Sequence, residues 1–157
     1  MMERSSQLIL VRGGGDIATG IIHKLYRCGF PVIILETAYP SAIRRQVSFC
    51  EAVYDGESQV EGVLCRRASS YEEALEILKA GELPVLVDET CEILRKVRPW
   101  ALVDAILAKK NLGTTRDMAD KTIGVGPGFT AGKDVDLVVE TMRGHNLGGI
   151  IGSGSAS

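Results

Sequence analysis

The stretch LVRGGGDIATGIIHKLYRCGFPVIILE, residues 10–36, decides the fold of this chain. It opens on an apolar run, passes through three consecutive glycines into a helical pattern, and ends in a second apolar run closed by Glu36. A strand, a tight glycine turn, a helix, a second strand and a final acid are the fingerprint of a dinucleotide-binding βαβ unit. The stretch therefore predicts a nucleotide site at the glycine turn, with a purely structural strand-to-helix turn as the alternative.

Each fingerprint residue has its own physical role. Gly13 permits the tight turn, Gly15 lets a pyrophosphate approach the backbone, and small Ala18 lets the helix pack close to the strand. The phosphates would then meet the positive N-terminal end of the helix. Glu36 would bind the hydroxyls of an unphosphorylated ribose and repel a 2'-phosphate, so NAD or another dinucleotide is the expected cofactor. The predicted cofactor-binding residues are Gly13, Gly14, Gly15, Asp16, Ile17, Ala18 and Glu36.

Asp16 is the unusual member of this set, because a carboxylate beside the phosphate seat repels an anionic ligand. Three interpretations stay open: the side chain caps the helix, coordinates a cation, or turns outward. Helix capping is the favoured one, and no metal site is predicted.

Strand-like and helix-like segments alternate along the whole chain. Strands are expected over 8–11, 32–35, 85–87, 101–107, 123–125 and 135–140. Helices are expected over 17–25, 41–53, 69–79 and 91–97, with Ser70 and Glu73 forming a capping box. Such alternation predicts an α/β, Rossmann-like three-layer domain with a mostly parallel sheet over residues 1–151. Residues 152–157 (GSGSAS) read as a flexible tail or the scar of a truncated C-terminal region.

Charge and hydropathy argue against two classes of binding partner. A net charge of -2 and a pI near 5.7 do not indicate a basic surface for nucleic acid, and no apolar run is long enough to span a membrane. We expect a cytoplasmic protein with a nucleotide-type small molecule as its ligand. The cysteines form no CxxC pair, so reduced, mostly buried thiols are expected. The segment 135–140 could pair at a sheet edge with a second copy, which would give a homodimer.

Two further loops are candidates for ligand or partner binding. Residues 124–134 combine Pro127 with several glycines, among them Gly126 and Gly128, and either accept a ligand or simply connect two strands. The second loop carries Arg143, His145 and Asn146. Arginine can bind an anion through two hydrogen bonds, histidine can exchange a proton near neutral pH, and asparagine offers an amide for hydrogen bonding. An ordinary polar loop is the alternative for this second loop.

Several motifs together resemble a known family. They are VRGGGDIATG (11–20), RRQVSFCEAVYDG (44–56), VDAILAKKNLGT (103–114), IGVGPGFTAGKDV (123–135) and VVETMRGHNLG (138–148). In this order they are similar to the accessory family of selenium-dependent molybdenum hydroxylases, the YqeB-type proteins, over about residues 8–151. The family is similar in part to XdhC-type chaperones, which possess a Rossmann-like domain and handle the molybdenum cofactor. Family members continue past the RGHNLG motif, whereas this chain stops within ten residues of it.

The resemblance implies an accessory protein in the maturation of these hydroxylases. Its ligand would be a nucleotide or the nucleotide-bearing molybdenum cofactor, a molybdopterin dinucleotide, and its partner a molybdenum hydroxylase subunit. The alternatives are an NAD-dependent oxidoreductase and a dinucleotide-sensing domain. An oxidoreductase needs a proton donor, for which the candidates are His145, Asp88, Asp104 and Lys109.

Overall fold

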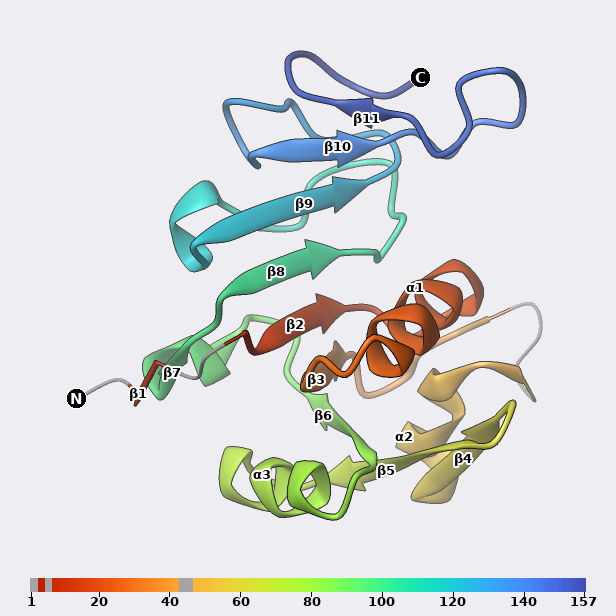
Figure 1. Ribbon diagram of the computed structural model, residues 1–157, viewed down its shortest axis with the longest axis vertical. Coiled ribbons are helices and arrows are strands. Elements are labelled where there is room, and N and C mark those ends of the chain that lie inside the picture. The colour runs from red at the N-terminus through yellow and green to blue at the C-terminus, as the bar shows by residue number, and fades with distance from the viewer. Residues whose placement is uncertain (1–2, 5–6, 43–46) are drawn as a thin grey trace.

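The computed structural model describes residues 3–4, 7–42 and 47–157, and a mostly parallel sheet of nine strands runs through it (Figure 1). The strand order is β11-β10-β9-β8-β2-β3-β6-β5-β4. These strands are β2 (Ile9–Arg12), β3 (Val32–Glu36), β4 (Glu57–Val60), β5 (Val63–Ala68), β6 (Leu83–Val87), β8 (Ala101–Asp104), β9 (Lys121–Val125), β10 (Leu137–Val139) and β11 (Ile150–Ile151). A separate parallel pair joins β1 (Glu3–Arg4) to β7 (Val97–Arg98).

Helices cover both faces of the central strands, so the expected Rossmann-like three-layer α/β fold is confirmed. The α-helices are α1 (Asp16–Arg27), α2 (Ala52–Asp55) and α3 (Tyr71–Lys79), and the short 3-10 helices are η2 (Phe49–Glu51), η3 (Glu92–Arg95) and η4 (Arg116–Met118). One buried core packs α1, η2 and α2 on Ile9, Val11 and Ile34. The other core packs α3 and η3 on Leu10 and Leu35. These leucines alternate along β2 and β3 with Ile9, Val11 and Ile34, so the two cores lie on opposite faces of the sheet.

The strand order places a crevice at the centre of the sheet. From β2 the chain forms β3, passes to the edge strand β4, comes back inward through β5 to β6, and then crosses to the other side of β2 as β8, β9 and β10. Arg12 at the end of β2 lies in register with Leu35 of β3 and Asp104 of β8. Connections leave in opposite directions at such a point, and ligands of open α/β sheets bind there.

Two of the predicted helices, over 41–53 and 91–97, are not continuous α-helices in the structure. The 41–53 helix falls partly outside the described residues, and its described remainder is η2 followed by the single turn of α2. Ser48 is extended, with φ -121° and ψ 137°, so a continuous helix cannot pass through it. The 91–97 segment is the 3-10 helix η3 followed by β7, because Cys91 has a left-handed φ of 59°. The Ser70 cap is confirmed, since the Ser70 Oγ accepts from the N–H of Glu73 at 3.1 Å.

The sheet edges differ from the expectation. Segment 135–140 is not an edge, because β10 pairs with β9 on one side and with β11 on the other. Among the described strands, β11 and β4 are the edges. β4 belongs to an antiparallel hairpin with β5 that the sequence analysis missed. Its two-residue turn, Glu61 and Gly62, has φ angles of 47° and 81°, as a tight primed turn requires.

The C-terminal residues make specific contacts. The backbone N–H of Ala131 donates to the Gly154 carbonyl at 2.7 Å, and the Ser157 N–H donates to a Glu140 carboxylate oxygen at 3.0 Å. Ala156 packs on a small apolar cluster around Phe129 and Val138.

Among the described residues, every helix is too short or too polar to traverse a bilayer.

Candidate functional site

Two glycines of the turn are required by the packing of the chain itself. Gly13 has a φ of 103°, and a Cβ atom there would lie 2.8 Å from the carbonyl oxygen of Ala105. A Cβ on Gly14 would lie 3.2 Å from the backbone nitrogen of Cys50, which donates a 2.8 Å hydrogen bond to the Gly14 carbonyl. Gly13 has no room for a side chain, and a side chain on Gly14 would require the Cys50 backbone to shift.

Gly15 differs from both neighbours. Its φ of -75° is open to any residue, and among the described residues the nearest atom to a Cβ there would be the Ser41 carbonyl oxygen at 3.9 Å. It is the N-cap of α1 and faces open space at the start of that helix. The fold therefore has no steric or conformational need for glycine at this position.

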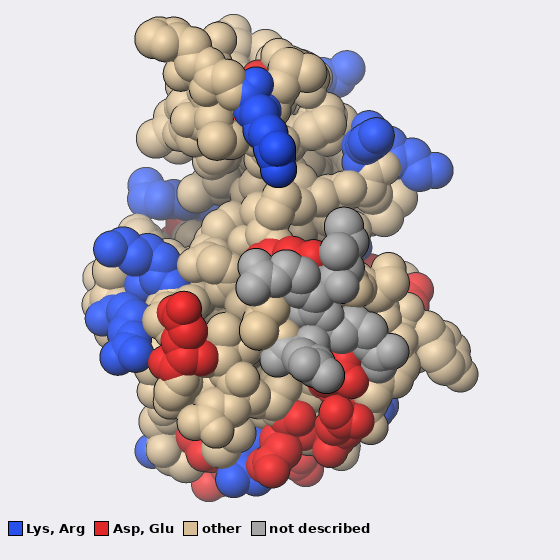
Figure 2. All heavy atoms as spheres, turned by 90° about the vertical axis from the view of Figure 1, so that its right-hand side faces the viewer, with Lys and Arg blue, Asp and Glu red and all other residues tan. Residues whose placement is uncertain are grey.

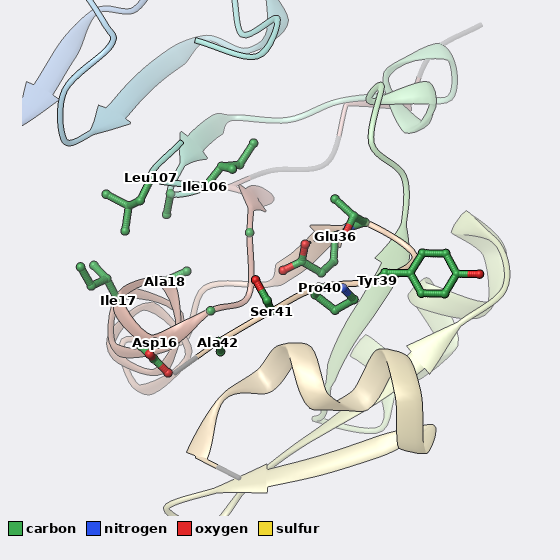
Figure 3. Close-up of a pocket in the computed structure, with 14 residues that line it drawn as sticks. Asp16, Ile17, Ala18, Glu36, Tyr39, Pro40, Ser41, Ala42, Ile106 and Leu107 are labelled. Atoms are coloured by element: carbon green, nitrogen blue, oxygen red, sulfur yellow. Dashed lines mark hydrogen bonds between the residues drawn. The ribbon is translucent and has the colours of Figure 1, made fainter. Parts of the chain in front are cut away.

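The open space is a cavity of about 630 Å³ at the carboxyl ends of β2, β3 and β8 (Figure 3). Its lining is Gly13, Gly15, Asp16, Ile17, Ala18, Glu36, Thr37, Tyr39, Pro40, Ser41, Ala42, Ala105, Ile106 and Leu107. The structure thus brings the predicted cofactor-binding residues to one cavity, except that Gly14 is turned to Cys50. Residues 105–107 after β8 form a second wall, which was not predicted from the sequence.

The Glu36 carboxylate is tied to the glycine turn. One oxygen accepts from the Gly14 N–H at 2.7 Å and the other from the Thr37 N–H at 2.8 Å. Because each carboxylate oxygen carries two lone pairs, each keeps an acceptor site for a ligand hydroxyl. The side chain projects to the cavity from the end of β3 (Figure 3).

Asp16 does not cap α1, so the favoured interpretation of this residue is wrong. The N-cap is Gly15, which has no side chain to cap with, and Asp16 is the first helical residue. One Asp16 carboxylate oxygen accepts a 2.7 Å hydrogen bond from the hydroxyl of buried Ser48. This bond joins the start of α1 to the segment that leads into η2.

The cavity is acidic in its described lining. Asp16 and Glu36 are charged, and no Lys or Arg is among the described residues that line it. The first turn of α1 leaves N–H groups without partners inside the helix, and its dipole is positive at this end. On the face shown in Figure 2, most Asp and Glu gather on the lower half, and most Lys and Arg lie toward the top and the sides.

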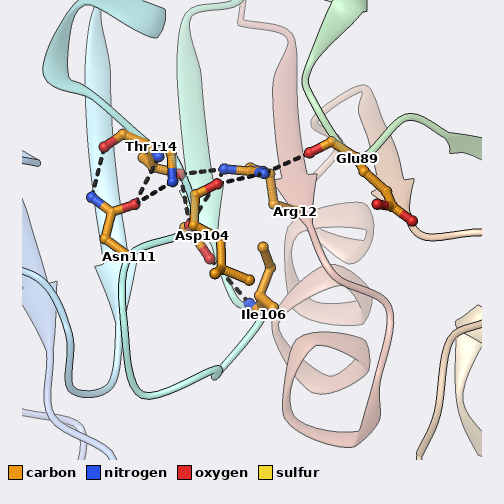
Figure 4. Close-up of polar contacts among 8 residues, drawn as sticks. Arg12, Glu89, Asp104, Ile106, Asn111 and Thr114 are labelled. Carbon is orange, nitrogen blue, oxygen red and sulfur yellow. Dashed lines mark hydrogen bonds and ion pairs between the residues drawn. The ribbon is translucent and has the colours of Figure 1, made fainter.

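A buried polar network, which the sequence analysis also missed, lies behind the turn (Figure 4). Arg12 is 5% exposed and donates to the Thr114 hydroxyl at 2.8 Å, while that hydroxyl donates to Asp104 at 2.6 Å. The guanidinium also donates to the carbonyls of Glu89 at 2.8 Å and Leu112 at 3.2 Å. It therefore joins the end of β2 to the segments that follow β6 and β8.

The other predicted loops do not reach the cavity. A Cβ on Gly128 would lie 2.7 Å from the Lys110 backbone, and one on Gly126 would lie 2.9 Å from the Leu107 side chain. These glycines make room for the chain's own residues. Arg143, His145 and Asn146 are exposed in the loop between β10 and β11, and none of them lines the cavity.

The candidate proton donors lie outside the lining of this cavity too, although Asp88 lines a smaller cavity beside it. Asp88 accepts from the backbone N–H groups of Glu92 and Ile93 at the start of η3, and Asp104 belongs to the Arg12 network. Lys109 is exposed outside the cavity lining.

The cysteines are free thiols, as expected. Burial raises the pKa of the Cys65 thiol, and Cys50 nearby raises it further. Burial also raises the pKa of Cys91, against the opposing effect of Arg12. Both thiols are therefore weaker nucleophiles than an exposed cysteine. In the part of the chain that the structure describes, no three His, Cys, Asp or Glu side chains form a group that could hold a metal ion.

Comparison with known proteins gives one informative similarity. Over 150 residues, 96% of its length, the chain is 54% identical to a protein of Escherichia coli (strain K12) described as uncharacterized protein YqeB. The chain spans 28% of that protein's length. No protein-family model matches the chain, and no solved structure matches it. The expected resemblance to YqeB-type proteins is confirmed by this identity, whereas the link to selenium-dependent molybdenum hydroxylases and the XdhC similarity stay predictions.

Proposed function

We propose that this chain binds a dinucleotide with unphosphorylated ribose hydroxyls and acts as an accessory protein in the maturation of selenium-dependent molybdenum hydroxylases. The observation that carries the binding proposal is the contrast within the glycine turn. The chain's own backbone lies close beside Gly13 and Gly14, whereas among the described residues the nearest atom to a Cβ on Gly15 is the Ser41 carbonyl oxygen at 3.9 Å, and Gly15 lines the 630 Å³ cavity. A glycine that the fold does not need is expected where a ligand comes close to the backbone.

Hydrogen bonding and the positive end of the α1 dipole favour the ligand in this cavity, whereas the Asp16 carboxylate beside the phosphates opposes it. Its pyrophosphate would lie over Gly15 against the N–H groups of the first α1 turn. A ribose would donate its hydroxyls to the acceptor sites that Glu36 retains after bonding Gly14 and Thr37. A 2'-phosphate would meet the Glu36 carboxylate, and the described lining offers no Lys or Arg to offset it.

NAD and the dinucleotide form of the molybdenum cofactor both contain the required pyrophosphate. The resemblance to YqeB-type proteins favours the second ligand and a hydroxylase subunit as the partner. Delivery of a bound cofactor needs no catalytic side chain. This agrees with the positions of the candidate proton donors, since His145, Asp88, Asp104 and Lys109 are not among the residues that line the main cavity.

Thermal unfolding with NAD, NADP, FAD, S-adenosylmethionine, CDP and CTP tests the binding proposal. A ligand at 100 times its Kd stabilises by about 2.7 kcal/mol, which raises the Tm of a domain of this size by about 5–10 °C. We expect CDP or CTP to raise the Tm and NADP to leave it unchanged. A shift with NAD but not with the cytidine nucleotides would support the oxidoreductase if NADH is turned over, and the sensor if it is not.

Two glycine substitutions in one helix make the test specific. Gly15→Val places a side chain where the pyrophosphate would lie, so the ligand-induced shift should vanish while the ligand-free Tm stays close to that of the wild type. Gly20→Ala is the matched control, because a Cβ at Gly20 meets nothing within 4 Å and Gly20 does not line the cavity. If the ligand raises the Tm of Gly15→Val as much as that of the wild type, the ligand does not bind at this turn.

The maturation role needs a separate readout. Cells that depend on this protein for an active selenium-dependent hydroxylase should lose that activity with Gly15→Val and keep it with Gly20→Ala. Normal hydroxylase activity in both variants would contradict the accessory role even if the nucleotide binds. A His145→Ala variant in the same assay tests the loop between β10 and β11.

A further inference from the structure

A second cavity of about 300 Å³ adjoins the first at the carboxyl ends of β2, β3 and β6. The two cavities share Gly13, Glu36, Thr37 and Ile106, so the Glu36 carboxylate stands at the border between them. The remaining wall of the second cavity is formed by Arg12, Leu35, Asp88, Glu89, Thr90 and Leu112. The space beside Glu36 is therefore divided into two parts, only one of which opens toward Gly15.

Leu112 forms an apolar wall that is fixed in place without a ligand. Its side chain is 44% exposed, although its backbone carbonyl accepts from the buried Arg12 guanidinium. The neighbouring Asn111 side-chain oxygen accepts from the N–H groups of Gly113 at 3.0 Å and Thr114 at 2.7 Å. Hydrogen bonds therefore hold the backbone around Leu112, and its partly exposed side chain offers an apolar contact to a ligand at the cavity wall.

The opposite wall is anchored to the same guanidinium. Arg12 donates to the Glu89 carbonyl at 2.8 Å, and the two Asp88 carboxylate oxygens accept from the backbone of η3 at 2.8 and 2.9 Å. Thr37 and Thr90 are exposed and add hydroxyl groups to this cavity. The cavity thus combines two fixed walls, apolar contacts from Ile106 and Leu112, and a few polar groups.

We propose that the second cavity is the nucleobase pocket of the bound dinucleotide, an inference that rests on the proposed nucleotide-binding function. With its hydroxyls on Glu36, the ribose has two substituents that leave in different directions. The phosphate side leads to Gly15 in the first cavity, and the base enters the second cavity. A flat heterocycle then packs on Ile106 and Leu112, and Tyr39 of the first cavity, 86% exposed, takes no part in holding it.

Titration calorimetry with NAD and with CDP tests this assignment on three variants. Leu112→Ala should weaken the Kd of the nucleotide that binds by about tenfold, because the substitution removes methyl contacts to the base. Tyr39→Ala should change the Kd by less than about twofold. Leu147→Ala is the matched control, since Leu147 is similarly exposed, at 57%, but lies in the loop between β10 and β11.

The outcomes separate the two proposals. Loss of affinity in Leu112→Ala alone supports the base pocket, and ring-current shifts of the Leu112 methyl resonances on binding would support it independently. Loss in Tyr39→Ala with an unchanged Leu112→Ala would overturn the base pocket and leave nucleotide binding intact. If neither NAD nor CDP binds the wild-type chain, both proposals fail together.

Discussion

The two glycine loops of this chain look alike in sequence and differ in what fills the space beside them. At residues 13–15, backbone from the chain closes on Gly13 and Gly14, and the space beside Gly15 stays open to a cavity. At residues 126–128, Leu107 and Lys110 occupy the space beside both glycines. A glycine can therefore accommodate either the protein or a ligand, and only the neighbouring atoms tell the two uses apart.

The largest effect is expected where the chain itself fills the space. Gly128→Ala should lower the free energy of unfolding by about 2–4 kcal/mol, since its φ of 106° is strained for alanine and the new Cβ would lie 2.7 Å from Lys110 backbone. Urea unfolding measures this. Gly132→Ala is the control, because its φ is 85° with no atom within 4 Å, and it should cost only about 1–2 kcal/mol. Equal costs would show that the close approach to Lys110 adds nothing.

Within the first loop, adjacent substitutions should separate the two uses of glycine. Gly14→Ala should cost about 1–2 kcal/mol, because the Cys50 backbone lies 3.2 Å from the new Cβ and is held there by its hydrogen bond to Gly14. Gly15→Ser, which keeps a favoured N-cap residue, should change stability by less than about 0.5 kcal/mol. Urea unfolding of the ligand-free variants gives both values, and a large loss in Gly15→Ser would contradict the open space beside Gly15.

The smallest effect concerns the strands beside the second loop, where a carboxylate joins β9 to β10. Burial alone would raise the pKa of Asp136, but hydrogen bonds from Thr122 and Arg116 outweigh it and lower this pKa below its ordinary value. A lowered folded-state pKa stabilises above the unfolded value of 3.8, and this contribution is lost as the pH falls through the folded pKa.

Asp136→Asn should therefore cost less than about 1 kcal/mol at neutral pH and flatten the acid limb of the stability curve below about pH 4. Thermal unfolding between pH 2 and pH 7 measures the change. Asp134→Asn in the preceding turn is the control, and the prediction fails if the two variants give the same acid limb.

The fold was predictable where local pattern and global packing agree. The stretch 10–36 contains a strand, a turn and a helix whose signals are all local, and the structure has them in place. The β4–β5 hairpin was missed, although Val60, Glu61, Gly62 and Val63 carry a two-residue turn signal between apolar residues. The prediction of a helix over 41–53 was wrong. The Cys50 N–H donates to the Gly14 carbonyl, and local helix propensity contains no information on a contact between residues so distant in sequence.

The candidate site was predictable only in its first wall. Residues 13–18 and Glu36 follow a known spacing, whereas residues 105–107 and Leu112 reach the cavities through strand order. Arg12 carried a weak signal, as a charged residue that ends a buried parallel strand opposite Asp104. Its partners at Glu89, Leu112 and Thr114 are distant in sequence and could not be identified from spacing.

The shared attachment to Arg12 has a dynamic consequence. Because one guanidinium bonds the carbonyls of Glu89 and Leu112, neither segment can swing away from the sheet without weakening the anchor of the other. The two segments should open as one cooperative unit, with matched hydrogen-exchange protection at the amides of Ile93 and Thr114, which lie in the hydrogen-bonded turns beside them. The walls of the second cavity would then fluctuate in concert, on a single timescale.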